Sequence, residues 1–447
     1  VIEVAIVRPG PIQGGMVHPY LRRRSGEESV TYPSPEVAQA LQRTLGVPIF
    51  QEQVMQLAVL AADFTPGEAD QLRRAMAAWK RKGGLGPFHE RLVGRMVAKG
   101  YAPEFAESIF KQIQGFGEYG FPESHAISFA LLVLASCWIK CHHPDAFLVA
   151  LLNSQPMGFY APAQLVRDAR AHGVEVLPVD VQTSGADSRL VPPSPNESLT
   201  AAKPALWPVR LGLNQVAGLS QAAAQRIERA REQRPFSQLD DLAQRAELNP
   251  QDLQALAGAN ALHSLAGHRH QAAWAVAGLD VRPTALLAQT LSSKVSLQHA
   301  VEVALSPPNE AQNMLADYRS LGLTLNRHPV ALLRPELAKL KVVSADQLQH
   351  FPNDRLARAS GLVTHRQRPS TAKGVVFVTL EDETGSINVI VWPQVAVQQR
   401  QVLLSARLMT VYGRWQRVGG VAHLLAQKLL DHSDWLHGLS NRSRDFH

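Results

Sequence analysis

The chain has 447 residues, of which 45% are hydrophobic and 19% charged, a composition typical of soluble globular domains rather than of disordered or fibrous chains. Its net charge of +7 favours a polyanionic partner. Only two cysteines occur, which excludes a disulfide-built scaffold and fits a reducing compartment, so we expect a cytoplasmic protein.

The first 155 residues are dominated by apolar residues at helical spacing. The opening stretch "VIEVAIV" is different and predicts a strand. Because the chain starts inside this apparent strand and without methionine, we expect it to be a fragment of a larger protein.

A basic run follows on the helix predicted around Glu68 to Trp79. Its members are Arg73, Arg74, Lys80, Arg81 and Lys82. A run of this kind is often a solvated helical face. Residues 1–150 hold 15 basic and 14 acidic residues, however, so the positive charge is concentrated in this run and in Arg22 to Arg24. That concentration favours contact with a polyphosphate or a nucleic-acid backbone.

Gly115, Gly117 and Gly120 have the G-x-G-x-x-G spacing of a dinucleotide-binding turn. Such a turn follows a strand and has an acidic residue about 20 positions later. Here a helical pattern precedes the glycines, and Lys140 and Cys141 occupy the later positions, so a nicotinamide-dependent enzyme is disfavoured. We expect a tight turn between two helices.

The next helix is expected to begin with Ser124 as its N-cap, followed by His125. A helix N-terminus can bind an anion, although a capped core helix is the alternative. The apolar run Ala126 to Ile139 is shorter than the ~20 residues of a membrane-spanning helix, so we expect a buried core helix and no membrane partner.

The two cysteines, Cys137 and Cys141, lie four residues apart and are followed by His142 and His143. A zinc site is disfavoured, because no second ligand pair occurs at finger spacing. We expect small core residues instead.

The Pro/Ser-rich residues 183–208 indicate a linker. Beyond it, Leu211 to Glu232 predict a helix, a short turn and a second helix. A helix-hairpin-helix turn presents backbone N–H groups to a phosphate, which assigns DNA contacts to Val216, Gly218 and Ser220. An ordinary pair of antiparallel helices is the alternative.

From Leu356 onward the apolar period changes to two, and five strands are predicted, as in an OB-fold barrel. Residues 351–447 carry 12 basic and 7 acidic residues, which favours single-strand binding over a structural barrel. The first loop is expected to hold Arg366, Arg368 and Lys373. The predicted stacking or phosphate-binding residues on the strands are Phe377, Trp392, Tyr412, Arg414 and Trp415.

Several long stretches in this order resemble the bacterial C-family DNA polymerases, which comprise the polymerase III alpha subunit and an error-prone relative. They are "IVRPGPIQGGMVHPYLRRR", "GVPIFQEQVMQ", "ADQLRRAM", "FGEYGFPESHA", "LLNSQPMGFY" and "GVVFVTLEDETGSINVIVW". The stretches "RPGPIQGGMVHPYLRRR" and the terminal "SRDFH" are similar in sequence to the error-prone branch.

The resemblance implies a multidomain fold: mainly α-helical fingers and a helix-hairpin-helix region, followed by a β-barrel OB-fold. The implied divisions are fingers at 1–155, a helix-hairpin-helix region at 156–280, a connecting segment at 281–350, the OB-fold at 351–432 and a tail at 433–447. It also implies that the PHP and palm domains are missing. No catalytic residue is therefore assigned, because the aspartates that hold two Mg²⁺ ions in this family lie upstream of "RPGP".

The implied activity is DNA-directed DNA polymerisation in translesion synthesis and repair, on primer-template and single-stranded DNA with dNTPs. Arg73 and Arg74 are assigned to the incoming triphosphate. Lys80, Arg81 and Lys82 are assigned to the triphosphate or the template, and Ser124 and His125 to the vicinity of the nascent base pair. The replicative alpha subunit and a non-catalytic DNA-binding protein remain alternatives.

The resemblance also implies accessory proteins. The segment Gln289 to Ser293, "QTLSS", is the nearest candidate for a clamp-binding peptide, but it has no aromatic residue to fill an apolar pocket. We therefore expect only indirect contact with the sliding clamp, through a Y-family-like accessory protein that acts together with a RecA-like accessory.

Overall fold

The computed structural model describes residues 1–7, 17–82, 86–115, 122–158, 160–192, 206–279, 305–369, 372–418, 420–436 and 444–446; residues 77–82, 115 and 444–446 are described by their backbone alone. The contacts divide the chain into two compact units, Val1–Trp138 and Ile139–His447. The glycine turn at Gly117 and Gly120 and the segment Gln289 to Ser293 lie outside the described residues.

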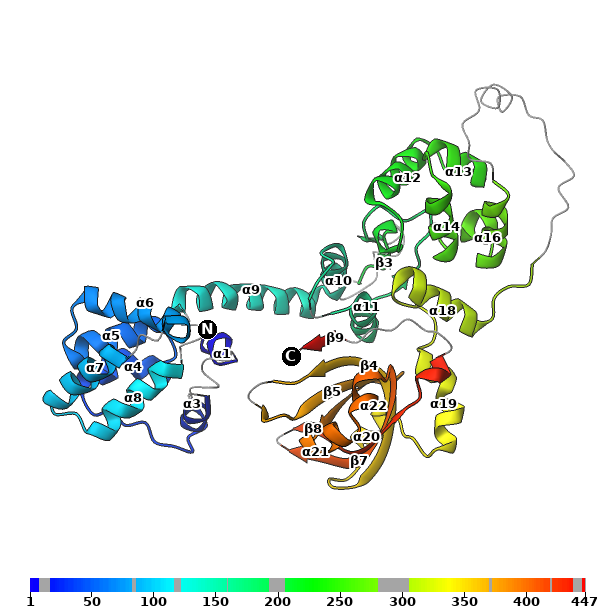
Figure 1. Cartoon of the computed structure of the whole chain (residues 1–447). Coiled ribbons are helices and arrows are strands. Elements are labelled where there is room, and N and C mark those ends of the chain that lie inside the picture. The colour runs from blue at the N-terminus through cyan, green and yellow to red at the C-terminus, as the bar shows by residue number, and fades with distance from the viewer. Residues whose placement is uncertain are drawn as a thin grey trace, which may run out of the picture. The chain divides into compact units, whose positions relative to one another are not determined.

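The first unit is helical throughout its described part (Figure 1). Its helices are α1 Ile2–Ile6, α3 Val17–Arg24, α4 Pro35–Leu41, the short 3₁₀ helix η1 Gln42–Thr44, α5 Gln51–Ala62, α6 Pro66–Lys82, α7 Gly86–Ala98, α8 Pro103–Gly115 and the start of α9 Glu123–His142. The strand predicted at "VIEVAIV" is wrong. These residues form α1, and Ala5 and Ile6 are buried in the helical core, where the described residues offer no strand to pair with.

Helix α9 also differs from its prediction as a buried core helix. It runs for 20 residues, and most of its apolar side chains are exposed, including Leu134 at 68% and Trp138 at 57%. Both cysteines on this helix are exposed and form no disulfide, so the prediction that they are core residues is wrong. Within the described residues, α9 alone is long and apolar enough to cross a membrane by length and composition, a test that core helices of soluble proteins also pass.

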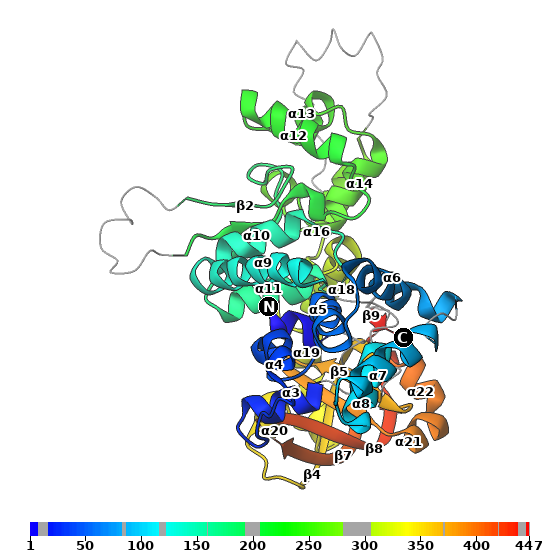
Figure 2. The ribbon, with the colours of Figure 1, turned by 90° about the vertical axis from the view of Figure 1, so that its left-hand side faces the viewer.

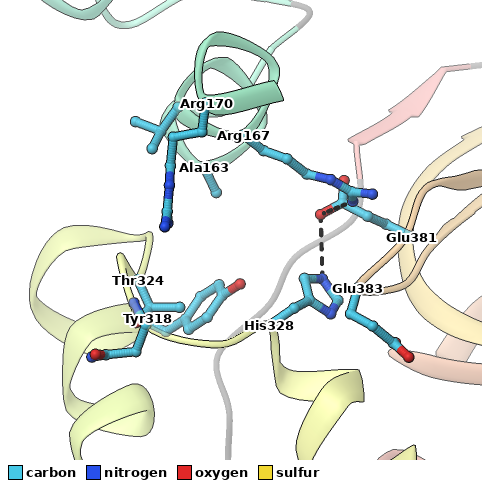
Figure 3. A pocket seen from close by; sticks show the side chains of 10 residues that line it. Ala163, Arg167, Arg170, Tyr318, Thr324, His328, Glu381 and Glu383 are labelled. Atoms are coloured by element: carbon cyan, nitrogen blue, oxygen red, sulfur yellow. Dashed lines mark hydrogen bonds and ion pairs between the residues drawn. The ribbon is translucent and has the colours of Figure 1, made fainter. Parts of the chain in front are cut away.

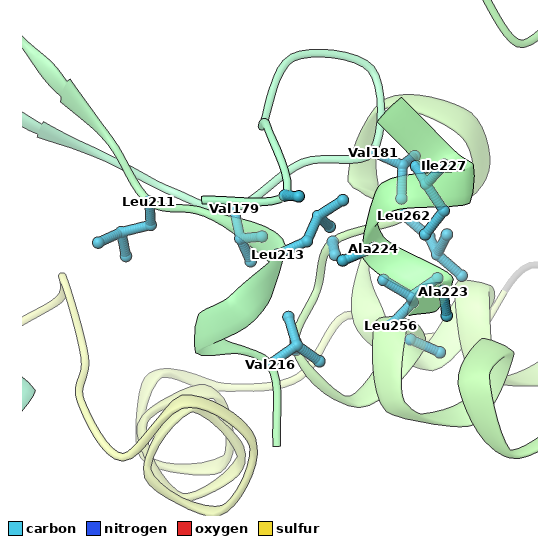
Figure 4. Close-up of a cluster of buried hydrophobic side chains, with 14 of the residues drawn as sticks. Val179, Val181, Leu211, Leu213, Val216, Ala223, Ala224, Ile227, Leu256 and Leu262 are labelled. Atoms are coloured by element: carbon cyan, nitrogen blue, oxygen red, sulfur yellow. The ribbon is translucent and has the colours of Figure 1, made fainter. Parts of the chain in front are cut away.

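The second unit begins with helices around a small three-stranded sheet. Its helices are α10 Pro144–Asn153, α11 Pro162–Ala171, η2 Leu213–Gln215, α12 Gln221–Gln233, α13 Leu239–Arg245, α14 Pro250–Gly258, α15 His263–Ala266 and α16 Arg269–Ala277. The strands β1 Val176–Leu177 and β2 Arg189–Leu190 pair with β3 Val209–Arg210 between them. Leu211, Leu213 and Ile227 pack in one buried cluster with α14 (Figure 4).

In the described residues 305–355, three further helices lie before the barrel: α18 Glu310–Leu321, α19 Pro329–Lys339 and α20 Ala345–Gln349. A buried ion pair holds α18 against α16, with 2.5 Å between Arg269 Nη2 and Asp317 Oδ1. The second oxygen of Asp317 accepts hydrogen bonds from Thr324 Oγ1 at 2.7 Å and from Asn326 Nδ2 at 3.3 Å. The paired charges and these hydrogen bonds satisfy a carboxylate that would otherwise be costly to bury.

The five predicted strands are all present and form a closed barrel (Figures 1 and 2). They are β4 Leu356–Gln367, β5 Val376–Glu381, β6 Ser386–Val391, β7 Leu408–Val418 and β8 Val421–Asp431. The strand order is β5-β6-β8-β7-β4, and β4 closes the barrel by pairing with β5 as well as β7. Among these five strands β6 and β8 pair in parallel and the other neighbours are antiparallel, which is the arrangement of an OB-fold.

Local features adjust this closure. The pairing of β7 with β8 shifts register after Tyr412, and a Cβ on Gly413 would lie 2.1 Å from the Leu425 carbonyl oxygen, so only glycine fits there. Two helices that were not predicted, α21 Pro393–Gln398 and α22 Arg400–Ser405, pack against β8. The short strand β9 Arg444–Phe446 pairs in parallel with the end of β4, beyond the point where β7 stops pairing with it.

Candidate nucleic-acid interface

The predicted hairpin turn lies between η2 and α12. The first of its two expected helices is a single 3₁₀ turn, because Gly212 and the end of β3 leave only three residues for it. Val216 is 3% exposed and points into the apolar cluster, so it anchors the turn rather than facing a ligand (Figure 4). Gly218 has φ +88°, a conformation that side chains disfavour, and both it and Ser220 are exposed.

The backbone amides of this turn are partly occupied. Ala217 N–H donates to the Ser320 carbonyl at the end of α18 at 2.7 Å. The hydroxyl of Ser220 accepts from Ala223 N–H at 3.1 Å and caps α12. Gly218 and the N-terminal turn of α12 are therefore the part of the hairpin that is positioned to meet a phosphate.

The predicted residues of the OB barrel separate into two groups. Arg368 and Lys373 are exposed in the loop between β4 and β5, as expected. A Cβ built on Gly374 in this loop would lie 3.7 Å from Pro393 and 3.9 Å from Arg368 Nη2, which brings the loop beside the start of α21. Trp392, which is 51% exposed, directly precedes α21. Two cations and an exposed indole ring thus gather at one end of the barrel, where Phe377 of β5 is half-buried.

Two other predictions on the barrel are corrected. Arg366 lies in β4 and not in the loop, because the strand continues to Gln367. It is 7% exposed, and its guanidinium donates to the carbonyls of Leu403 at 2.6 Å and Ala406 at 2.5 Å, so in this structure it braces α22 instead of facing solvent. Trp415 is 1% exposed and belongs to the barrel core, which leaves no free face for a base.

Arg73 and Arg74 lie on α6 and share one carboxylate. Arg73 Nη2 is 2.8 Å from Asp70 Oδ1, and Arg74 Nη2 is 2.8 Å from Asp70 Oδ2. The hydrogen bond from Arg73 lowers the pKa of Asp70. Both arginines remain substantially exposed, and a triphosphate would compete with Asp70 for them. Lys80, Arg81 and Lys82 lie in the last turns of the same helix, where only the backbone is described.

The N-terminus of α9 begins at Glu123, so Ser124 is the second residue of the helix and not its N-cap. The Glu123 N–H donates to Glu52 Oε2 at 2.9 Å, and the Glu123 carboxylate binds Arg43 at 2.6 and 3.0 Å. The positive end of the helix is thus already met by a carboxylate from α5. His125 is half-buried, with its ring 4.5 Å from that of Phe129 in an edge-to-face contact.

A cavity of about 200 Å³ in the second unit was not predicted. It lies between α11, the segment from α18 to α19, and the end of β5 (Figure 3). At its edge, Glu381 of β5 lies 2.9 Å from Arg167 Nη1 of α11 and 3.4 Å from His328 Nε2. His328 Nδ1 accepts the Val330 N–H at 3.2 Å, so its ring proton in the neutral state is on Nε2, facing Glu381.

Both carboxylates that line this cavity are paired with cations. Burial opposes ionisation of Glu381, but His328 and Arg167 outweigh it and lower its pKa. Burial, together with the Glu381 charge, raises the pKa of Tyr318, whose hydroxyl points into the space in Figure 3. The nearby Glu383 is paired with Arg334 at 2.6 Å. These ion pairs join the barrel to the preceding helices.

Three family descriptions match the chain in order. "Bacterial DNA polymerase III alpha subunit finger domain" matches residues 1–100, "Helix-hairpin-helix motif" residues 173–272, and "OB-fold nucleic acid binding domain" residues 358–431. With the closed barrel, they confirm the multidomain fold class that the sequence predicted.

The chain is also similar over its whole length to curated proteins. It is 58% identical to the error-prone DNA polymerases of Bordetella bronchiseptica and of Alkalilimnicola ehrlichii. Both alignments cover 100% of this chain and 42% of the relative, so the chain spans less than half the length of these relatives. Among solved structures, asparaginyl-tRNA synthetase from Pyrococcus horikoshii is 20% identical over a match that covers 20% of this chain and 22% of that chain, with a TM-score of 0.18, too low to indicate a common overall fold.

Proposed function

Because this chain aligns from its first residue to its last with bacterial error-prone DNA polymerases, the relatives of the polymerase III alpha subunit, we propose that it provides the fingers, helix-hairpin-helix and OB-fold modules of such an enzyme. The parent activity is DNA-directed DNA polymerisation, a nucleotidyl transfer used in translesion synthesis and DNA repair. The observation that carries the proposal is the 58% identity over the whole chain, across three modules in the order of the family.

The nucleotidyl-transfer step itself is not assigned to these residues. Two-metal catalysis needs carboxylates that hold both ions, and the described part of the chain contains no group of three or more His, Cys, Asp or Glu side chains that could hold a metal. The residues therefore do not fit a Mg²⁺ site. We place the Mg²⁺-binding carboxylates in the portion of the polymerase that this chain does not cover.

In this proposal the fingers bind the nucleotide. Arg73 and Arg74 leave Asp70 and donate charge-assisted hydrogen bonds to the triphosphate, while Lys80, Arg81 and Lys82 on the same helix contact the triphosphate or the template. Ser124 and His125 contact the nucleotide near the nascent base pair. The hairpin at Gly218 contacts the DNA backbone, and Trp392 with Arg368 and Lys373 binds single-stranded DNA.

The first test uses the 447-residue chain. It should bind primed and single-stranded DNA, with an affinity that falls steeply as salt rises, and it should not extend a primer. Fluorescence anisotropy and a primer-extension gel measure the two properties. Robust extension by the isolated chain, or DNA affinity that does not respond to salt, would contradict the proposal.

The second test uses the full-length parent enzyme. Arg73→Ala or Arg74→Ala should raise KM for dNTP and lower kcat, with a loss of roughly ten- to a hundredfold in kcat/KM, since a hydrogen bond to a charged group contributes about 1.5–3 kcal/mol. His125→Ala should slow incorporation with little loss of DNA affinity. Lys111→Ala, an exposed cation on α8, is the matched control. Unchanged kinetics in folded Arg73 and Arg74 variants would return the basic run to a solvated helical face.

We further propose that the parent enzyme works in the cytoplasm, where bacterial chromosomal DNA lies. It is recruited through a Y-family-like accessory protein that carries the clamp peptide, together with a RecA-like accessory, because tethering raises the effective concentration at a primer end. A pull-down of the parent enzyme with purified sliding clamp tests this. Tight direct binding to the clamp that is abolished by replacing the segment from Gln289 through Ser293 would show that the polymerase needs no accessory protein for recruitment.

A further inference from the structure

The outer face of the barrel carries a cross-strand row of cations away from the loop that holds Arg368 and Lys373. In the pairing of β4 with β7, Arg358 lies opposite Tyr412, and in the pairing of β7 with β8, Tyr412 lies opposite Lys428. The three side chains therefore stand side by side on three neighbouring strands, which are spaced by about 4.8 Å. Arg358 and Lys428 are exposed, and Tyr412 between them is half-buried.

These two cations share one aromatic ring. The guanidinium carbon of Arg358 lies 4.7 Å from the centroid of the Tyr412 ring, and Lys428 Nζ lies 6.0 Å from it. Both distances fall within the range of cation–π attraction. The ring therefore holds two like charges close to each other on an exposed surface, an arrangement that an added anion would stabilise.

The charges of this row are only partly neutralised locally. Arg358 Nη1 donates to the Leu340 carbonyl at 2.9 Å, and within the described residues neither Arg358 nor Lys428 has a carboxylate within 4 Å. Half-buried arginines of the same unit behave differently, since Arg167 and Arg334 each contact a glutamate. Arg414, two residues beyond Tyr412 on the same face of β7, is exposed and only weakly paired: its Nη1 lies 4.0 Å from Asp354 Oδ1 and donates to the Asp354 carbonyl at 3.3 Å.

The register links this row to the loop end of the barrel. Ile390 of β6 pairs with Leu425 of β8, and Leu425 pairs with Arg414. The exposed Trp392 follows two residues after Ile390. A continuous line of outer-face positions thus leads from the end of β6, where Trp392 lies, across β8 to the cations on β7 and β4.

We propose that Arg358, Tyr412, Arg414 and Lys428, the outer row, form a second phosphate-binding surface that extends the path of single-stranded DNA beyond Trp392 and the loop between β4 and β5. The inference rests on the proposed function, because it assumes that the barrel binds single-stranded DNA. A nucleic-acid backbone fits this row because its phosphates offer repeated negative charges without requiring a particular base. The Tyr412 ring holds the cations at its faces, so it positions them rather than stacking on a base.

The test compares oligonucleotides of two lengths on the whole 447-residue chain. An oligothymidine of about 6 nucleotides should occupy the loop end alone, whereas one of about 20 should reach the outer row as well. Arg358→Gln combined with Lys428→Gln should weaken binding of the long oligonucleotide about tenfold and reduce the slope of log affinity against log salt by about 1.4, from two lost phosphate contacts. Binding of the short oligonucleotide should change less than twofold.

The matched control, Lys339→Gln with Arg400→Gln, removes two exposed cations elsewhere in the unit. Its net charge therefore equals that of the double variant at Arg358 and Lys428. It should leave both oligonucleotides unaffected. Lys428→Gln alone serves if the double variant fails to fold, because no hydrogen bond of Lys428 would be lost among those the structure describes. It should lower the salt slope by about 0.7.

The outcomes separate the two hypotheses. If the unchanged chain binds neither oligonucleotide, DNA binding by the barrel fails. If it binds both and the double variant keeps the affinity and salt slope for the long one, only the outer row is overturned. Binding of polyglutamate is measured in the same way. If the double variant loses the polyglutamate binding of the unchanged chain but keeps its DNA binding, the DNA role of the outer row is overturned, and an acidic protein is identified as the partner of this face.

Discussion

Replacing Glu381 by glutamine removes a carboxylate that both Arg167 and His328 approach. The substitution keeps the shape of the side chain, so it tests charge and not packing. Glu381 is 9% exposed, and Arg167 retains 28% exposure of its side chain. Breaking a buried ion pair from one side costs about 3–5 kcal/mol, and we expect about 3 kcal/mol because Arg167 keeps access to water.

The loss should appear where the barrel meets the preceding helices. Hydrogen exchange of peptides from β5 and from α11 reports the free energy of local opening, which suits a chain with several domains better than a single melting temperature. Arg167→Ala and the double variant complete a mutant cycle, in which we expect a coupling energy of about 1–3 kcal/mol. Glu336→Gln is the control, because it removes only an exposed pair with Lys339 and should cost less than about 0.5 kcal/mol.

The pH dependence gives an independent check. The folded-state pKa of Glu381 is lowered, so its contribution is present above the unfolded value of about 4.3 and is lost as pH falls through the lower folded value. The difference between the unchanged chain and Glu381→Gln should therefore shrink as pH falls below about 4. Unchanged hydrogen exchange in Glu381→Gln, or strictly additive effects in the double-mutant cycle, would refute a stabilising ion pair between the barrel and the preceding helices.

Other substitutions test the barrel more locally. Asp382 is fully buried and accepts hydrogen bonds from Thr384 N–H at 2.8 Å, Gly385 N–H at 2.9 Å and Ala345 N–H at 2.7 Å, so Asp382→Ala should lower the free energy of opening, measured by hydrogen exchange of barrel peptides, by at least about 3 kcal/mol. Arg366→Gln should lower barrel stability by about 1.5–3 kcal/mol and leave the salt dependence of DNA binding unchanged; a selective loss of DNA affinity would contradict the bracing role. Gly413→Ala should cost about 1–3 kcal/mol, because its Cβ would overlap the Leu425 carbonyl, and a variant as stable as the original would show that the β7–β8 bulge can relax.

The strands of the barrel were predictable because the apolar period changes to two from Leu356 onward. Arg366 shows the limit of this approach. Its sequence neighbours resemble a loop, and only the longer pairing of β4 with β5 carries it into the barrel wall. Likewise, Val216 and Trp415 have the residue types expected of a contact surface and of a stacking platform, but their neighbours in the fold bury both.

Other features depend on elements distant in the sequence. Glu381, Arg167 and His328 meet from three separate elements, and no local spacing connects them. The outer row is intermediate in difficulty. Arg358, Tyr412 and Lys428 occupy outward positions of predicted strands, but their adjacency depends on the register, which is set by the shift after Tyr412. Helix α1 differs again, because a β-branched stretch of seven residues has no strand partner in its described surroundings and packs as a helix.

Strand β9 has a consequence for the solution behaviour of the molecule. Where β7 ends its pairing, His365 to Gln367 of β4 would present unpaired backbone donors and acceptors, and β9 covers them. An uncovered strand edge is a template for pairing with another chain. Dissociation of the short segment Arg444–Phe446 would therefore expose an edge of β4 to which another chain could pair. Fusions or tags joined directly after this segment would favour dimers that exchange this strand.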